Sequence, residues 1–402
     1  MRRGFLGNSK KYVQDSQPKD PLANGNPSDL MQSRRIAEMD ATIKVETDYT
    51  VIWQEEDSGL ILQSDYRFES PYFGYFPAGS SAPEMVYIDD DVTQVEDAFD
   101  WPVWKQPALK PIPHNERCFR IHEARGKGLA MVANRAIKKG ECIFTERPFY
   151  VSVQTKAIAP DMGVKSGGGF HRNATSRLGE KACRALLDLS NCYKEDEMDE
   201  IPGKLGTNYL PVDVAPTQNE KKKYGGAFQT LSRANHSCAP NANYYFDFAS
   251  FSGRFLAVQD IAEMEEITIM YTDTLADARA RGESLLETHR FLCKCAFCTL
   301  PYDKQKESDG NRIHLREMRD ALSAVPPLSM SIDKMRNAII LAEKEQVFAY
   351  VSQLWFLGGC NLRLRGINSE LIEAKNWLRK AAESYAIMEG EGGVHARLVA
   401  SL

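Results

Sequence analysis

The sequence lacks the marks of a secreted, membrane-spanning or general nucleic-acid-binding protein. Nine cysteines among 402 residues are too few for a disulfide-knit scaffold. The longest apolar run, residues 347–360, is interrupted by Ser352 and Gln353 and is too short to cross a bilayer. A net charge of −5 argues against a protein that binds phosphate backbones generally, although it permits a local basic patch.

The N-terminus also lacks a targeting pattern. No apolar stretch follows Arg2 and Arg3, so we expect no signal peptide. We therefore expect a protein of the nucleus or the cytoplasm, where clustered cysteines bind metal more often than they form disulfides. The rest of the composition is ordinary for a globular protein, with 43% apolar and 26% charged residues.

The chain divides into parts that differ in composition and periodicity. At about 100–200 residues per domain, its length suits two or three domains. A polar N-terminus without periodicity predicts a disordered tail, and alternating apolar residues in the middle of the chain predict strands. The expected parts are a tail over 1–35, an extension of unknown fold over 36–115, a strand-rich domain over 116–273 with a helical insert at about 170–225, a cysteine-rich loop over 274–300 and a helical region over 301–402.

Local patterns predict individual elements around the strand-rich domain. Leucines recur at helical spacing, which predicts a helix at about 174–193. Residues 266–271 are typical of a strand. A second helix is expected at about 275–290, with Thr274 and Asp277 as a capping box.

The C-terminal region is expected to be helical throughout. Its predicted helices span about 311–324, 332–357 and 369–389. Pro326-Pro327 and Gly358-Gly359 are expected to separate them, because proline and glycine disfavour helix interiors.

Seven acidic residues and no lysine or arginine lie between Glu84 and Asp100. The ordinary interpretation is a solvated acidic face. The alternative is a clamp for a basic segment of a substrate. The sequence leaves both interpretations open.

Three cysteines within six residues, Cys293, Cys295 and Cys298, indicate a metal site. Tetrahedral zinc takes four ligands, with Zn–S bonds of about 2.3 Å, and a tight loop can supply three of them. Cys238 is the best candidate for the fourth, because Pro240 fixes the backbone direction of its turn. Four thiolates close the site, so one structural zinc is favoured over a hydrolytic one. Incidental buried cysteines and a disulfide are the alternatives.

Three further patterns are ambiguous when taken singly. Residues 125–129 form a Gly-x-Gly turn between two strand-like segments, which alone predicts a tight hairpin. Residues 235–241 read Asn-His-Ser-Cys-Ala-Pro-Asn, in which His236 alone would be a structural histidine. Residues 265–273 hold Tyr271 at the end of a strand, where a tyrosine ordinarily packs in the core or at an edge.

In this order, and followed by Cys293-x-Cys295-x-x-Cys298, the patterns closely resemble the SET-domain protein-lysine methyltransferases. The resemblance covers about 117–300. It is greatest to the branch with a split SET domain, a post-SET cysteine loop and C-terminal helices, as in the SET-and-MYND proteins. The MYND zinc module is missing, as in fungal and plant relatives, because only Cys183, Cys192 and His171 could ligate a metal between residues 155 and 225.

The resemblance implies a mixed α+β fold. Small curved β-sheets would carry a knot-like crossing, in which residues 235–241 thread beneath the loop that holds Tyr271. A helical insert, a zinc-bound post-SET loop and a helical C-terminal region would complete the chain. The implied activity is methyl transfer from S-adenosylmethionine to a lysine of a histone or non-histone protein, without a nucleic-acid or membrane partner.

The resemblance also implies roles for individual residues. Tyr271 would be catalytic, its hydroxyl lying beside the reacting amine, and Phe291 would stack on the adenine unless it only packs in the core. His289, where relatives often carry tyrosine, and Phe297 would line the lysine channel. The full set of implied cofactor contacts is Lys127, Gly128, Leu129, Asn235, His236, Tyr271 and Phe291.

Two other function classes stay open. A SET-fold pseudoenzyme or adaptor would bind protein partners through the C-terminal helices and the acidic N-terminal region, and His289 favours it. A zinc-stabilised nucleic-acid binder is disfavoured by the net charge of −5. The substrate protein, the number of methyl groups and the oligomeric state are not determined by these patterns.

Overall fold

The structure is a computed structural model. It describes residues 49–51, 61–64, 72–76, 83–89, 91–105, 112–124, 126–154, 168–194, 197–214, 222–324, 330–390 and 392–401. All of them belong to one compact unit, Asp48–Leu402. The tail expected over 1–35 lies outside the described residues.

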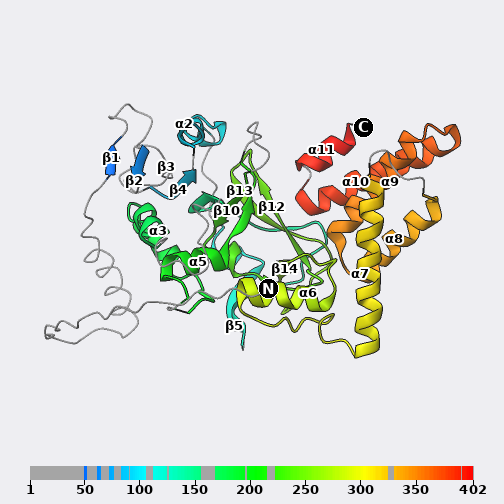
Figure 1. Ribbon diagram of the computed structural model, residues 1–402, viewed down its shortest axis with the longest axis horizontal. Coiled ribbons are helices and arrows are strands. Elements are labelled where there is room, and N and C mark those ends of the chain that lie inside the picture. Colours follow the sequence, from blue (N-terminus) through cyan, green and yellow to red (C-terminus); the bar gives the residue numbers. More distant parts are fainter. Residues whose placement is uncertain are drawn as a thin grey trace, which may run out of the picture. The chain divides into compact units, whose positions relative to one another are not determined.

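The largest sheet joins the N-terminal extension to the strand-rich domain. Its order is β1-β2-β3-β4-β8-β10-β9, and only the β4–β8 pair is parallel. Strands β4, β8 and β10 are buried along their whole length, so the extension shares the core of the domain. The strands are β1 (Tyr49–Val51), β2 (Ile61–Ser64), β3 (Tyr72–Phe76), β4 (Met85–Asp89), β8 (Tyr150–Val153), β9 (Leu210–Val212) and β10 (Tyr224–Ala227) (Figure 1).

Three smaller sheets carry the segments singled out in the sequence, as expected for a mixed α+β fold. Their pairings are the hairpin β5–β6, the antiparallel set β12-β13-β7 and the parallel pair β11–β14. The strands are β5 (Phe119–Ala124), β6 (Gly128–Ala133), β7 (Cys142–Glu146), β11 (Asn235–His236), β12 (Ala242–Asp247), β13 (Ser252–Ala257) and β14 (Thr268–Ile269).

The strand predicted over 266–271 is shorter than expected. Residues 268–269 pair with β11, and Glu266 forms an isolated bridge to Val132 of β6. The side chain of Asn241 bonds to backbone groups that a longer ladder would use, because its Oδ1 accepts from the Thr268 N–H and its Nδ2 donates to the Glu266 carbonyl. A side chain thus replaces part of the backbone ladder beside the predicted site.

The acidic stretch is not a solvated face throughout, so that interpretation is wrong at Asp89. This residue is 0% exposed, and its carboxylate accepts hydrogen bonds from the hydroxyls of Tyr87 and Tyr224. It also pairs with the Lys222 ammonium at 2.6 Å. Asp91 caps helix α2 (Val92–Phe99) by accepting from the Thr93 N–H. Two of the acidic residues are therefore structural.

The insert contains shorter helices than predicted, together with strand β9. The helix expected at about 174–193 is replaced by α3 (Gly168–Thr175) and α4 (Glu180–Leu187), which are followed by α5 (Glu200–Asn208). Gly179 separates the first two, because it is extended and its N–H bonds to the Pro83 carbonyl instead of to the preceding turn. A tertiary hydrogen bond therefore overrides the helical spacing of the leucines.

The C-terminal region is helical, and its helices α7–α11 lie together (Figure 1, yellow to red). Helix α10 contacts strands β12 and β13, and the Met388 carbonyl accepts from the Asn243 side chain. Among the described residues, no helix has the length and apolar character of a membrane span. The helices are α6 (Ala278–His289), α7 (Tyr302–Ser323), α8 (Ile332–Lys344), α9 (Phe348–Leu364), α10 (Leu371–Glu389) and α11 (Val394–Ala400).

Several predicted helix boundaries are wrong. Helix α7 begins at Tyr302 rather than near 311, and the helix expected over 332–357 divides where Gln346 adopts a φ of 55°. Helix α6 is capped by Asp277, whose carboxylate accepts from the Ala280 N–H. Thr274 lies before the cap and is buried, so no capping box forms.

Gly358 and Gly359 do not break a helix but lie inside α9. A Cβ atom on Gly358 would overlap the ring of Trp377 on α10, and one on Gly359 would lie 2.9 Å from Leu378 Cγ. The two glycines therefore allow α9 and α10 to approach closely. The low helix propensity of glycine is offset here by packing.

We expect Gly358→Ala to destabilise the protein by about 1–3 kcal/mol, because the added methyl group overpacks the Trp377 ring. Gly310→Ala is the matched control. Gly310 also lies inside a helix, α7, but its Cβ would meet nothing within 4 Å. The control should stabilise by about 0.5–1 kcal/mol. Chemical denaturation measures both, and equal effects of the two variants would contradict this packing role.

Candidate functional site

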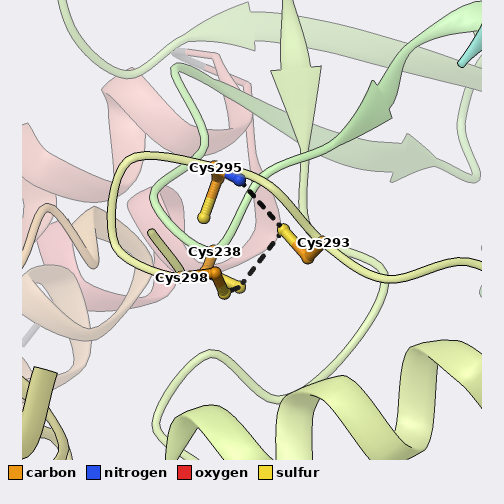
Figure 2. A group of neighbouring side chains, drawn as sticks. All are labelled: Cys238, Cys293, Cys295 and Cys298. Atoms are coloured by element: carbon orange, nitrogen blue, oxygen red, sulfur yellow. Dashed lines mark hydrogen bonds between the residues drawn. The ribbon is translucent and has the colours of Figure 1, made fainter. Parts of the chain in front are cut away.

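The structure brings the four predicted cysteine ligands together. Cys238 follows β11, and Cys293, Cys295 and Cys298 lie in the loop after α6. The four sulfurs all lie within 4.8 Å of one another, with 3.5 Å from Cys238 to Cys298 and 4.0 Å from Cys238 to Cys293 (Figure 2). Tetrahedral zinc with bonds of about 2.3 Å requires sulfurs about 3.8 Å apart, so the donor set fits zinc.

Two buried guanidinium groups adjoin the sulfurs. Arg281 and Arg312 are 1% and 0% exposed. Arg281 Nη2 lies 3.9 Å from Cys298 Sγ, and its buried Nε has no hydrogen-bond partner among the residues that the structure describes. Arg312 Nη1 donates to the Cys238 carbonyl at 3.0 Å. Four thiolates on one zinc would carry a net charge of −2, and Arg281 beside Cys298 would offset part of it. Arg312 is already paired with the buried carboxylate of Glu345 at 3.2 Å, and it acts on the site through its bond to the Cys238 carbonyl.

His236 links the sulfur cluster to Tyr271. Its Nδ1 accepts from the Tyr271 backbone N–H at 3.0 Å, and its Nε2 lies 3.3 Å from Cys238 Sγ. Because Nδ1 is an acceptor, the ring proton lies on Nε2 and is donated to the sulfur. Burial lowers the pKa of His236 to about 4, so the ring is neutral at physiological pH.

Four rings form a continuous group around Tyr271. The rings of Tyr271 and His289 are stacked with centroids 4.7 Å apart. His236 lies 5.5 Å from Tyr271, and Phe291 lies 6.3 Å from His236 and 6.4 Å from His289. The Tyr271 hydroxyl donates to the Ala234 carbonyl at 2.6 Å. Burial and the charge of Glu266 raise the pKa of Tyr271, so its hydroxyl stays protonated.

His289 and Phe297, the predicted channel residues, have different surroundings. His289 ends α6, its Nδ1 lies 2.7 Å from the Thr288 hydroxyl, and burial lowers its pKa. Among the described side chains, Phe297 has no ring contact with the group around Tyr271. Its ring lies instead under the guanidinium of Arg312, at 4.7 Å.

The glycine turn presents a charged edge to the same region. Gly126 and Gly128 have φ values of 75° and 72°, and a Cβ on either would meet nothing within 4 Å. Between them, Lys127 pairs with Glu266 at 2.6 Å. The turn is therefore open to a ligand and carries both signs of charge.

Glu266 is a site residue that sequence reasoning missed, as it missed Arg281 and Arg312 beside the sulfurs. Its Oε1 accepts from the Asn235 Nδ2 at 2.9 Å, and the same amide donates to the Leu129 carbonyl at 3.1 Å. Asn235 pairs with Thr268 across the β11–β14 ladder. Glu266 precedes Thr268 by two residues, so strand periodicity predicts that both lie on one side of the segment. That periodicity was the available signal.

We expect metal-replete protein to contain about one zinc per chain, and Cys295→Ser to lose it, because serine is a poor zinc ligand. Cys142→Ser is the matched control, since Cys142 is an exposed free cysteine in strand β7. Elemental analysis by mass spectrometry measures the metal. Wild-type protein without zinc, or equal loss in both variants, would contradict the assignment.

Comparison with known proteins identifies the domain that carries the glycine turn, Asn235-His236, Cys238, Glu266 and Tyr271. Residues 126–272 match the family model described as "SET domain". The chain is 26% identical over 281 residues to "Histone-lysine N-methyltransferase set5" of Schizosaccharomyces pombe, covering 69% of this chain and 81% of that protein. It is 39% identical over 134 residues to "Histone-lysine N-methyltransferase ASHR1" of Arabidopsis thaliana, covering 32% of this chain and 27% of the relative.

A human relative extends the comparison. The chain is 29% identical over 114 residues to "Protein-lysine N-trimethyltransferase SMYD5" of Homo sapiens, covering 28% of this chain and 27% of that protein. The matches thus span most of the fission-yeast protein and about a quarter of the plant and human proteins. The chain therefore carries a SET domain and is homologous to proteins named as lysine methyltransferases.

Proposed function

We propose that this protein transfers a methyl group from S-adenosylmethionine to the ε-amine of a lysine in a protein substrate, histone or non-histone. The observation that carries the proposal is the meeting of three segments, the glycine turn, Asn235-His236 and Tyr271, around Glu266. Lys127 and Asn235 both bond to its carboxylate, and His236, which follows Asn235, accepts from the Tyr271 backbone N–H. The proposed setting is the nucleus or the cytoplasm.

The charged edge suits the amino-acid end of S-adenosylmethionine, which carries one carboxylate and one ammonium group. Lys127 offers a positive charge and Glu266 a negative one, and Asn235 adds an amide. Phe291 offers an aromatic face for the adenine. These residues would hold the cofactor, which supplies a methyl group on positively charged sulfur when bound.

The ring group around Tyr271 suits the lysine. A free lysine has a pKa of about 10.4, and only the neutral amine is nucleophilic. A half-buried aromatic environment disfavours the ammonium form and so lowers that pKa. The Tyr271 hydroxyl, held by the Ala234 carbonyl, would orient the amine, and such positioning supplies much of the rate acceleration.

The sulfur cluster would act on the reaction through folding. Zinc bound by Cys238 and the three loop cysteines would hold the loop of residues 293–298 against the turn that begins with Asn235. The His236 bridge from Cys238 to Tyr271 then makes the aromatic group depend on that turn. The cysteines hold the site together and take no part in the chemistry.

The experiment that tests the function uses tritiated S-adenosylmethionine and a lysate of cells from which the gene has been deleted. Added wild-type protein should label one or a few lysate proteins. A noncatalytic adaptor, the alternative function, would label none.

We expect Tyr271→Phe to lower kcat in this assay by about 30- to 1000-fold, which corresponds to ~2–4 kcal/mol of transition-state stabilisation. The phenylalanine ring should retain the 4.7 Å stack on His289, so cofactor affinity should change little. Retention of nearly full turnover, together with its loss in His289→Ala, would assign the decisive group to the imidazole instead.

We expect Asn235→Ala to weaken S-adenosylmethionine binding by roughly 10- to 100-fold, about 1.4–2.8 kcal/mol. The variant loses the amide that fixes Glu266 and the Leu129 carbonyl. Asn134→Ala is the control, since its amide also bonds a backbone carbonyl, that of Arg117, but from an exposed turn. Calorimetry measures both affinities, and wild-type affinity in Asn235→Ala would remove this residue from the cofactor site.

A further inference from the structure

One face of α7 contacts the segment that follows Tyr271. Asp309, Arg312 and Arg316 are three and four residues apart, so they lie on the same side of the helix. Asp309 accepts from the Ala278 N–H at 2.8 Å, and Arg312 Nη1 donates to the Thr274 carbonyl at 2.5 Å. Arg316 Nη2 donates to the Asp273 carboxylate at 3.1 Å.

Arg312 is the centre of this face. Its Nη1 also donates to the carbonyl of Cys238, and its Nε and Nη2 donate to the side chain and the carbonyl of Glu345. One buried guanidinium therefore fixes the sulfur-bearing turn and the segment after Tyr271 to the C-terminal helices. The planar fork of arginine permits this combination, which a lysine ammonium would not reproduce.

Asp273 is held on both carboxylate oxygens. Oδ2 accepts from Arg316 on α7, and Oδ1 accepts from the Tyr350 hydroxyl on α9 at 3.0 Å. Oδ1 also accepts from the Leu275 N–H at 2.9 Å. Residues 270–277 form no helix or strand, so these bonds from the C-terminal helices supply much of the order of the segment.

We propose that Asp309, Arg312 and Arg316, with Tyr350, are positioning residues that set Tyr271 for methyl transfer. The C-terminal helices are then part of the reaction machinery and not only an attached binding module. This inference rests on the proposed function. Tyr271 is fixed on its other side by His236 and Ala234, so the α7 face and Asp273 complete its placement.

The Arg316–Asp273 pair allows a test in a folded protein. Its side chains are 37% and 47% exposed, and pairs of this kind contribute little to stability. Arg336 is the matched control. It bonds to Glu373 on α10 and lies 3.6 Å from Asp333 on its own helix, α8, and it is 50% exposed. Arg316→Met removes an ion pair between α7 and the segment after Tyr271, and Arg336→Met removes a comparable ion pair between α8 and α10.

In the tritium assay we expect Arg316→Met to lower kcat by roughly tenfold, while the Kd for S-adenosylmethionine and the Tm stay at their wild-type values. Arg316→Lys should recover part of the rate, since an ammonium can still pair with Asp273. Asp273→Asn should behave like Arg316→Met. Hydrogen exchange followed by mass spectrometry should show faster exchange at residues 272–278 in Arg316→Met, but not in Arg336→Met.

Unchanged kcat in Arg316→Met, or an equal loss in Arg336→Met, would overturn the inference while leaving the proposed function intact. So would unchanged hydrogen exchange at residues 272–278. If wild-type protein labels no lysate protein, the proposed function fails and the positioning role fails with it. Labelling by the wild-type protein therefore shows whether the proposed function holds, and the variants then test the positioning role by itself.

Discussion

The site depends on one neutral imidazole that is bonded on both sides. His236 accepts from the backbone of Tyr271 and donates to the sulfur of Cys238. Burial keeps the ring uncharged, so both bonds persist at physiological pH. The parallel pairing of β11 with β14 places the ring there, because it sets Asn235-His236 beside Thr268-Ile269. The sulfur cluster, the aromatic group and the glycine turn are therefore held in fixed positions relative to one another.

Charged groups lie on two sides of the site, and the rings between them are neutral. The side next to the sulfurs carries two buried cations, Arg281 beside Cys298 and Arg312, which is paired with the buried carboxylate of Glu345. The side next to the glycine turn carries the Lys127–Glu266 pair, in which Lys127 is half-exposed, and a Cβ on either glycine of the turn would meet no atom within 4 Å. Between the two lie rings whose titratable members, His236, His289 and Tyr271, are all neutral at physiological pH because of burial. The arrangement suits a reaction in which a neutral amine must persist beside charged groups.

Short motifs selected cysteines that lie together in the structure, whereas propensities misplaced several helices. The four cysteines could be chosen from spacing and one proline-fixed turn, and Tyr271 and His236 from their place in ordered motifs.

The prediction of a single helix at about 174–193 was wrong because the Gly179 N–H bonds to the Pro83 carbonyl, a contact distant in sequence. The prediction that Gly358-Gly359 breaks a helix was wrong because the ring of Trp377, on another helix, occupies the space that a side chain on Gly358 would need. The prediction that Asp89 lies on a solvated face was wrong because its partners Tyr224 and Lys222 lie more than a hundred residues away in the sequence. Each error comes from a tertiary contact that local sequence does not carry.

The central claim is that this protein places methyl groups on lysine. It is tested most directly by mass spectrometry of the proteins that acquire label from S-adenosylmethionine in the deletion lysate, with the modified residue located by fragmentation. The account predicts one, two or three methyl groups on a lysine side chain, which disappear when Tyr271→Phe replaces the wild type. Methyl groups found on another residue type, or no methylated protein in the presence of zinc-replete wild type, would contradict it.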